Sequence, residues 1–283
     1  MPSLPVTVYT AESPLKNPAR LMREMLRDLV ASRELAWRLF IRDISAQYRQ
    51  SALGYIWVFI PPLVASLPFI YLNSQGVVKI GDTPIPYAAY AIIGTTIWQV
   101  FADALNAPLR AVLGARSMLA RINLPREAIL LSALAQVGMG FLVRLLLLIG
   151  VLVWFRLVPP ATAVLFPLGI LSLILVGFFV GLLVTPIGIL YSDVQLTLPI
   201  FATFLMLLTP VVYPPPQSGI AAAIAHFNPL TPLVVSTRDW LTLGTVPNVG
   251  AFVAVSATAA TLLLIVWIIF RIAMPHLIAR IGN

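Results

Sequence analysis

Long stretches of this chain carry almost no charge, and this feature limits the possible folds more than any other. Apolar residues make up 60% of the 283 residues, and charged residues make up only 10%. A soluble domain carries about 25% charged residues. So little polar surface cannot cover a soluble globule of this size. The sequence therefore predicts an all-α protein that crosses a membrane several times.

Six apolar segments are predicted to cross the bilayer as helices. A helix rises about 1.5 Å per residue and a bilayer core is about 30 Å thick, so one span needs about 20 residues. Pro61, Pro62 and Pro68 interrupt the first segment, and we expect a bent or broken helix there. The predicted spans cover residues 55–73, 87–109, 128–155, 163–190, 196–213 and 250–270.

The residues outside the spans fall into three kinds. Residues 1–20 are polar and proline-rich, which predicts a flexible tail with helix starting near Asn17–Pro18. Residues 21–50 carry arginines and apolar residues at helical spacing, which is typical of an amphipathic helix at a membrane interface. Residues 51–283 are assigned to the transmembrane domain. Within it, the apolar pieces between residues 214 and 249 are too short to span, and predict re-entrant or interfacial helices between spans five and six.

The basic residues lie mostly on one side of this topology. Six spans place both termini on the same side, which carries 14 of the 18 lysines and arginines; three lie on the other side, and Arg144 lies within a span. Excess Lys and Arg marks the cytoplasmic side. We therefore expect both termini in the cytoplasm. This topology also accounts for most of the net charge of +8, so no nucleic-acid partner is expected.

The residue types present exclude several kinds of chemistry. There is no cysteine, and His226 and His276 are the only histidines, so we expect no metal site. Neither Lys16 nor Lys79 follows a glycine-rich turn, so we expect no P-loop for ATP. An enzyme acting on lipid-linked sugars would need a carboxylate cluster that the sequence does not assemble.

The source of energy can be argued from the charges within the spans. Ion-coupled carriers place ionisable groups at membrane depth, and here Arg144 and Asp103 are the candidates. Because the spans hold so few ionisable groups, we expect the energy for transport to come from a separate partner. An ion-coupled carrier that acts without an ATPase stays an alternative. Arg144 itself has two interpretations, a structural residue that reaches the interface or a backbone carbonyl, or a direct substrate contact.

Five short segments occur in a characteristic order along the chain. They read RDISAQYRQSALGYIWVFIPPL (Arg42–Leu63), INLPREAILLS (Ile122–Ser132), YSDVQLTLPIF (Tyr191–Phe201), LLTPVVYPP (Leu207–Pro215) and NPLTPLVVSTRDWLTLG (Asn228–Gly244). Together they resemble the ABC-2-type permeases that export polysaccharides, and in particular the O-antigen and teichoic-acid exporters. Ser192 departs from the pattern, because the family more often has a basic residue before this aspartate.

The resemblance implies a half-transporter of the bacterial inner membrane. Two copies would form a channel and bind two copies of a separate ATP-binding cassette subunit. That subunit would hold ATP and Mg, so this chain would be neither an enzyme nor a cofactor carrier. The substrate would be an O-antigen-like polysaccharide on an undecaprenyl-type lipid, a step in lipopolysaccharide biosynthesis. An ABC-2 exporter of another lipid or of a drug stays the nearer alternative.

The same resemblance suggests three groups of site residues. Coupling to the ATPase would involve Leu124, Pro125, Arg126 and Glu127 in the polar segment Arg110–Glu127, together with Asp193. A gate for the lipid phosphate would involve Arg38, Arg42, Arg49, Gln50 and Gly54, since guanidinium forks suit phosphate. Sugars would slide along Trp57, Phe59, Tyr71, Tyr90 and Phe201.

Each of these groups also has a structural interpretation. The polar segment could be a solvated loop, the basic helix a membrane anchor, and the aromatics lipid-facing. The short helices before the last span, which carry His226, Arg238 and Asp239, would form an external cap over the pore or a loop packed on the bundle.

Overall fold

The computed structural model describes residues 18–49, 51–77, 81–119 and 125–281. Every regular element within these ranges is a helix, as predicted. Residues 1–17 of the predicted tail, and the candidate site residues Gln50 and Leu124, lie outside the described ranges. In chain order the helices are α1 (Pro18–Ala31), α2 (Arg33–Tyr48), η2 (Gly54–Val58), α3 (Ile60–Ser74), α4 (Tyr87–Gly114), α5 (Arg116–Leu119), α6 (Arg126–Trp154), η3 (Ala161–Leu165), α7 (Phe166–Leu190), α8 (Ser192–Leu208), α9 (Gly219–Phe227), α10 (Leu230–Thr242) and α11 (Val249–Ile281).

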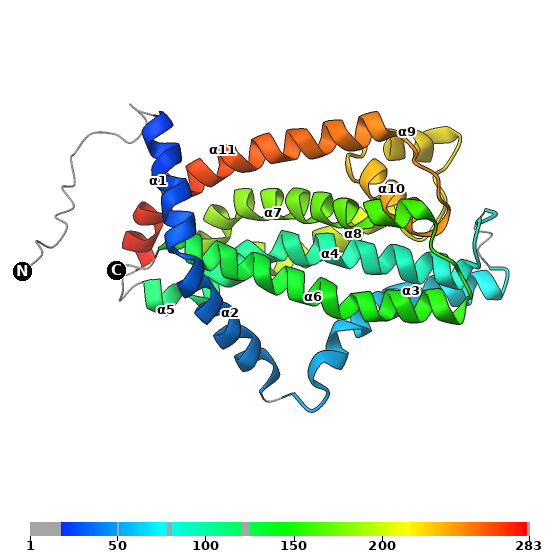
Figure 1. The fold of residues 1–283 in the computed structure, drawn as a ribbon, viewed down its shortest axis with the longest axis horizontal. Coiled ribbons are helices and arrows are strands. Elements are labelled where there is room, and N and C mark those ends of the chain that lie inside the picture. Colours follow the sequence, from blue (N-terminus) through cyan, green and yellow to red (C-terminus); the bar gives the residue numbers. More distant parts are fainter. Residues whose placement is uncertain (1–17, 50, 78–80, 120–124, 282–283) are drawn as a thin grey trace, which may run out of the picture.

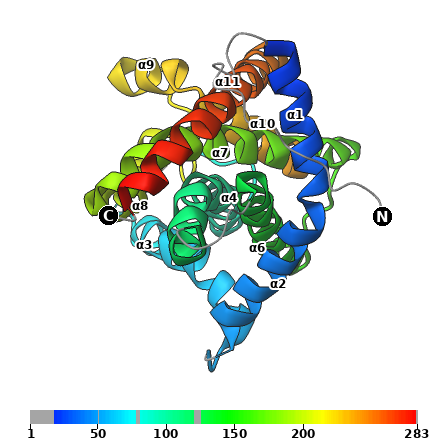
Figure 2. The same ribbon diagram turned by 90° about the vertical axis from the view of Figure 1, so that its left-hand side faces the viewer.

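Helix α4 forms the centre of the bundle. In its most apolar stretch, 78% of the residues are buried inside the molecule, whereas the figure for α11 is 17%. Figure 2 views the bundle end-on and shows α4 surrounded by α3, α6, α7 and α8. Because α4 is covered on so many sides, its polar residues must find partners inside the protein.

Two glycines of α7 allow it to lie directly against α4. A Cβ atom on Gly181 would fall 2.2 Å from the carbonyl oxygen of Leu105, and one on Gly177 would fall 2.7 Å from that of Phe101. These are backbone atoms, which cannot move aside without shifting the helix. Small residues four apart are the usual means of bringing two membrane helices into backbone contact. This contact fixes the position of α4 along the bundle.

Four helices are long and apolar enough to cross a membrane: α4, α6, the continuous η3–α7 segment, and α11. The count rises to five if α9 and α10, which are bent by 89° at their junction, form one broken span. Helices α3 and α8 are apolar but shorter. With 15 and 17 residues, they are about 22 Å and 26 Å long. Six spans therefore stays a prediction that depends on these two helices.

The first predicted span begins differently from expectation. Residues 54–58 form the short 3₁₀ helix η2, and α3 begins only at Ile60. Pro61 and Pro62 thus lie in the first turn of α3, where a missing N–H costs nothing, while Pro68 lies inside the helix. The predicted interruption is therefore located before α3.

The fifth and sixth spans also have different bounds from those expected. Only Tyr191 is extended between α7 and α8, because helix resumes at Ser192 with Asp193 in its first turn, where a carboxylate is favourable. Helix α8 ends at Leu208, since Thr209 precedes Pro210 and takes an extended conformation. Helix α11 continues past residue 270 to Ile281.

The predicted amphipathic helix is divided into α1 and α2, which meet at Ser32. The N–H of Ser32 donates to the carbonyl of Asp28, and the N–H of Ala36 donates to that of Ser32, both at 2.8 Å. Helix α2 buries Leu39 and Phe40 and leaves Trp37 exposed. Figure 1 shows α1 crossing the end of the bundle where α11 finishes and α6 starts, which we call the terminal end; α9 and α10 lie at the opposite end.

Candidate functional site

A polar cavity of about 410 Å³ lies between α2, η2, α4 and α6. Its lining combines amides, paired charges and aromatic rings, in a part of the chain that is otherwise apolar. Of the aromatics predicted for the sugar path, Trp57 lines it. The polar lining residues are Asp43, Gln47, Tyr48, Tyr55, Gln99, Asp103, Arg110, Gln136 and Arg144.

An ion pair joins α4 to α6 beside this cavity. Arg144 Nη1 donates to Asp103 Oδ2 at 2.6 Å, and Gln99 Nε2 donates to Asp103 Oδ1 at 3.2 Å. The Arg144 side chain is only 5% exposed. A charge at this depth needs an opposite charge as its partner. The structure thus gives Arg144 a carboxylate partner, which neither interpretation of the sequence had named.

A second carboxylate holds α2 against the same cavity. Arg42 donates from Nε and Nη2 to Asp43 Oδ1 at 2.8 Å and 2.6 Å, and Gln136 donates to Asp43 Oδ2 at 3.2 Å. Another Arg42 nitrogen contacts the sulfur of Met118 in α5. The guanidinium of Arg42 is therefore occupied by protein groups.

The remaining predicted gate residues are differently placed. Arg38 pairs with Glu34 at 2.6 Å on an exposed helix face, an interaction worth at most about 1 kcal/mol. Arg49 is exposed, and no acidic partner for it lies among the described residues. Gly54 has a φ of +51° and starts η2. A glycine is required at this position, because a side chain is disfavoured in the left-handed conformation that directs the chain into α3.

Tyr48, at the end of α2, adds a neutral phenol to the cavity. Burial, followed by the neighbouring Tyr55, raises the pKa of Tyr48 above its ordinary value. The side chain is therefore an uncharged donor and acceptor at neutral pH.

Three of the predicted coupling residues, Pro125, Arg126 and Glu127, lie at the terminal end, at the start of α6. Arg271 of α11 donates to Glu127 of α6 at 2.9 Å and to Asp28 of α1 at 2.5 Å. Arg126 also donates to the Arg271 carbonyl at 3.1 Å. Glu127 is buried, whereas Pro125 is exposed just before α6. This cluster, Asp28–Glu127–Arg271, connects three helices that are far apart in sequence.

Asp193 is exposed in the first turn of α8. The structure brings Arg126 and Glu127 together with Arg271, whereas the ion pairs of Arg271 among the described residues are with Asp28 and Glu127 and not with Asp193.

The other aromatics predicted for the sugar path differ in exposure. Tyr71 of α3 and Phe201 of α8 are exposed at 64% and 52%, and Phe59 is half-buried. Tyr90 is only 2% exposed. Its ring faces the Arg238 guanidinium at 3.8 Å, and its hydroxyl donates to the Tyr213 carbonyl at 3.1 Å. In this conformation Tyr90 belongs to a packed cluster.

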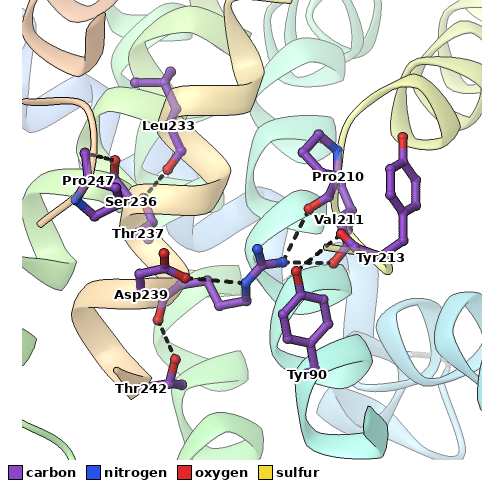
Figure 3. Close-up of polar contacts among 11 residues, drawn as sticks. Tyr90, Pro210, Val211, Tyr213, Leu233, Ser236, Thr237, Asp239, Thr242 and Pro247 are labelled. Carbon is purple, nitrogen blue, oxygen red and sulfur yellow. Dashed lines mark hydrogen bonds and ion pairs between the residues drawn. The ribbon is translucent and has the colours of Figure 1, made fainter. Parts of the chain in front are cut away.

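Arg238 of α10, which lies at the opposite end of the bundle (Figure 1), is the centre of that cluster. Figure 3 shows its neighbours Tyr90, Pro210, Val211 and Asp239 close together. Its Nη1 donates to the carbonyls of Pro210 and Val211, each at 3.2 Å, and Asp239 lies 3.7 Å from its Nε. Those carbonyls belong to the non-helical segment after α8, so they lack helical partners. Arg238 supplies the donors they need and fastens α10 to α4 and α8.

Neither the group of polar residues that lines the cavity nor the Arg238 cluster was predicted from the sequence. A signal for the cavity existed, because Gln99, Asp103 and Arg110 recur at spacings of four and seven residues in α4 and therefore share one face. No comparable signal pairs Tyr90 with Arg238, because their contact depends on how α10 folds back.

Comparison with known proteins then adds the family. Residues 34–241, which contain the residues that line the cavity and the Arg238 cluster, match the model of the ABC-2 type transporter family. The chain belongs to the ABC-2 type transporter family. The ABC-2 permease is 24% identical over 246 residues to the O-antigen export system permease protein RfbA of Myxococcus xanthus, covering 86% of this chain and 93% of that protein. It is 23% identical over 207 residues to an RfbA of Klebsiella pneumoniae, covering 72% and 78%.

Membership of this family and the four long apolar helices make the ABC-2 permease a multi-pass membrane protein and a transport subunit. The resemblance stated from the five sequence segments is thereby confirmed at the level of the family.

Proposed function

We propose that this permease is the membrane-spanning subunit of an ATP-driven exporter for a lipid-linked, O-antigen-like polysaccharide. Two copies would act with two copies of an ATP-binding cassette subunit and move the polymer from the cytoplasm across the bacterial inner membrane. The observation that carries the proposal is the match along most of the chain to permeases named for O-antigen export.

The terminal end suits contact with an ATPase. Helix α1, the start of α6 and the end of α11 meet there, joined by Asp28, Glu127 and Arg271. Both described chain ends lie at this end (Figure 1), as do most of the basic residues, which favours the cytoplasmic side. A displacement of the start of α6 would be passed through Glu127 and Arg271 to α11 and α1.

Helices α3 and α8 suit a channel formed by two copies. Both are short for a bilayer core of about 30 Å, which is tolerated where a helix is covered by protein. Each carries a row of exposed apolar side chains that a second copy or a translocating chain would contact. These are Val64, Leu67 and Tyr71 on α3, and Leu196, Ile200, Phe204 and Leu207 on α8.

The lipid pyrophosphate would approach along the basic face of α2. Arg49 is exposed at its end, and the preceding Tyr48 packs on Tyr55 of η2 with ring centroids 4.3 Å apart. Arg42 and Arg38 would take part only by exchanging a carboxylate for a phosphate oxygen. The proposal therefore gives Arg49 the first contact.

The proposal can be tested in cells that lack the chain. We expect lipid-linked polymer to accumulate in the cytoplasm and surface polymer to disappear. Supplying the wild-type chain should restore the surface polymer only when the partner ATPase is able to hydrolyse ATP. Normal surface polymer in the deletion strain would contradict the proposal.

The Asp103–Arg144 pair favours one other candidate, a carrier driven by an ion gradient, because such carriers use charged groups at membrane depth. In that case export would persist with an inactive ATPase and stop when the ion gradient is dissipated. An ABC-2 exporter of another lipid or drug would instead leave the surface polymer intact.

A further inference from the structure

We infer that the cavity between α2, η2, α4 and α6 binds the sugar adjoining the lipid pyrophosphate and not the pyrophosphate itself. The inference rests on the proposed function, because it names the part of that substrate which this cavity recognises.

The charge of the cavity argues against an anionic ligand. Its lining holds two carboxylates, Asp43 and Asp103, and two guanidinium groups, Arg110 and Arg144. Arg144 is already paired with Asp103. Asp43, which also lines the cavity, is paired with Arg42. A pyrophosphate site needs an excess of cationic donors. This lining is balanced, so a neutral ligand fits better.

The hydrogen-bonding groups match those of a sugar. Gln47, Gln99 and Gln136 line the cavity from α2, α4 and α6. Gln99 and Gln136 already donate to Asp103 and Asp43, and each amide also carries a carbonyl oxygen that can accept. Sugar hydroxyls also donate and accept, so the two sets can satisfy each other. Trp57 adds an exposed ring at the rim. Pockets of this kind combine apolar and aromatic walls with a few convergent polar groups.

One buried donor has no protein partner. Arg144 is 4% exposed, and its Nε has no hydrogen-bond partner among the described residues, although its Nη1 binds Asp103. Buried donors are usually satisfied, but Arg238 Nε and Trp240 Nε1 are also buried without a hydrogen-bond partner in that part of the chain. All three atoms are closed off from solvent, so they mark no ligand site, and the proposed sugar contacts are those of the amides.

The size of the cavity limits how much of the substrate it holds. About 410 Å³ lies near the lower end of the range of about 300–1,000 Å³ for small-molecule sites. The cavity therefore suits the first sugar or two and cannot hold a polymer. Recognition here would distinguish a glycosylated lipid from the bare carrier before transport begins.

The test uses the complete complex of permease and ATP-binding subunit in lipid nanodiscs. Two probes are compared: a polyprenyl pyrophosphate without sugar, and the same lipid carrying one neutral N-acetylhexosamine. The measurement is the lipid concentration that gives half-maximal stimulation of ATP hydrolysis. For the wild-type complex we expect the glycosylated lipid to act at a concentration about tenfold lower, the effect of one or two hydrogen bonds.

The variant carries Gln99→Leu and Gln136→Leu together. Asp103 keeps Arg144 and Asp43 keeps Arg42 in this variant, so neither carboxylate of the cavity loses its cation. We expect the preference for the glycosylated lipid to fall below about threefold, while the response to the bare lipid stays unchanged. The matched control is Gln75→Leu, an exposed glutamine at the end of α3, which should keep the full preference.

Three results would overturn the inference. They are an unchanged preference in the double variant, an equal loss of response to both lipids in a complex that still elutes as a single species, and no preference in the wild-type complex. A wild-type complex that responds to neither lipid would count against the proposed function itself. If the wild-type complex prefers the glycosylated lipid and the double variant keeps the same preference, the proposed function stands and only the sugar site is rejected.

Discussion

At the scale of single residues, Arg238 shows how an apolar bundle accommodates a charge. The segment after α8 leaves the carbonyls of Pro210 and Val211 without helical partners, and the buried guanidinium donates to both. Tyr90 presents its ring face to the same cation. The arginine and the unwound segment therefore depend on each other, because each satisfies a group that would otherwise be costly to bury.

Replacing this arginine should destabilise the permease strongly. Arg238→Met keeps a similar length but leaves both carbonyls and Asp239 without their cation, so we expect a loss of about 3 kcal/mol in unfolding free energy. Thermal unfolding of the detergent-solubilised protein measures the effect. Arg23→Met, on an exposed position of α1, is the matched control and should change the melting temperature little. Equal melting temperatures for the two variants would contradict this role.

At the scale of helices, the bundle depends on the close contact between α4 and α7. Gly181 faces the Leu105 carbonyl so closely that no side chain fits, whereas Gly138 in α6 has open space around its Cβ position. The two glycines thus provide a direct comparison of packing with intrinsic helix preference.

Gly181→Ala and Gly138→Ala should therefore have opposite effects. We expect Gly181→Ala to cost about 1–3 kcal/mol by forcing α7 away from α4. Gly138→Ala should stabilise the protein by about 0.5–1 kcal/mol, because alanine loses less backbone entropy in a helix. Melting temperatures of both variants decide this; a neutral Gly181→Ala would mean that the helices are not in backbone contact.

The terminal cluster connects helices rather than stabilising one of them. Glu127 is buried and paired with Arg271, which also holds the half-exposed Asp28. Glu127→Gln should uncouple transport from ATP hydrolysis by a factor between about 2 and 30, the usual range for residues that link two sites. The ratio of polymer exported to ATP hydrolysed measures this. Asp28→Asn, which removes a more exposed charge, should change this ratio less. A larger effect of Asp28→Asn than of Glu127→Gln would contradict the role of Glu127 in linking the helices.

The sequence predicted the helices better than their ends or contacts. Apolar runs and the uneven distribution of arginines were enough for the fold class and the long helices around α4, α6, α7 and α11. The end of α8 depends on Pro210 and on donors from Arg238, which lies 28 residues further along the chain. The cavity depends on how α2 returns across α6. Such contacts come from tertiary packing. The spacing of Gln99, Asp103 and Arg110 shows that they share one face of α4, but not which helix packs against that face.

At the scale of the whole molecule, the two ends of the bundle are organised differently. The terminal end is held by two ion pairs of Arg271, one with the half-exposed Asp28 and one with the buried Glu127, whereas the opposite end is locked by the buried Arg238 cluster. The cavity lies between them. An exporter that receives energy at one end and releases polymer at the other would use these differences, with movement concentrated at the Asp28–Arg271 pair, which is the more solvated one.

The central claim is that a separate ATPase drives this permease to move a lipid-linked polysaccharide. The most direct test is transport of labelled lipid-linked polymer in proteoliposomes that contain the permease with or without its ATP-binding subunit. The account predicts polymer movement only when both subunits and ATP are present, and none with a non-hydrolysable analogue. Movement by the permease alone, driven by an ion gradient, would contradict it.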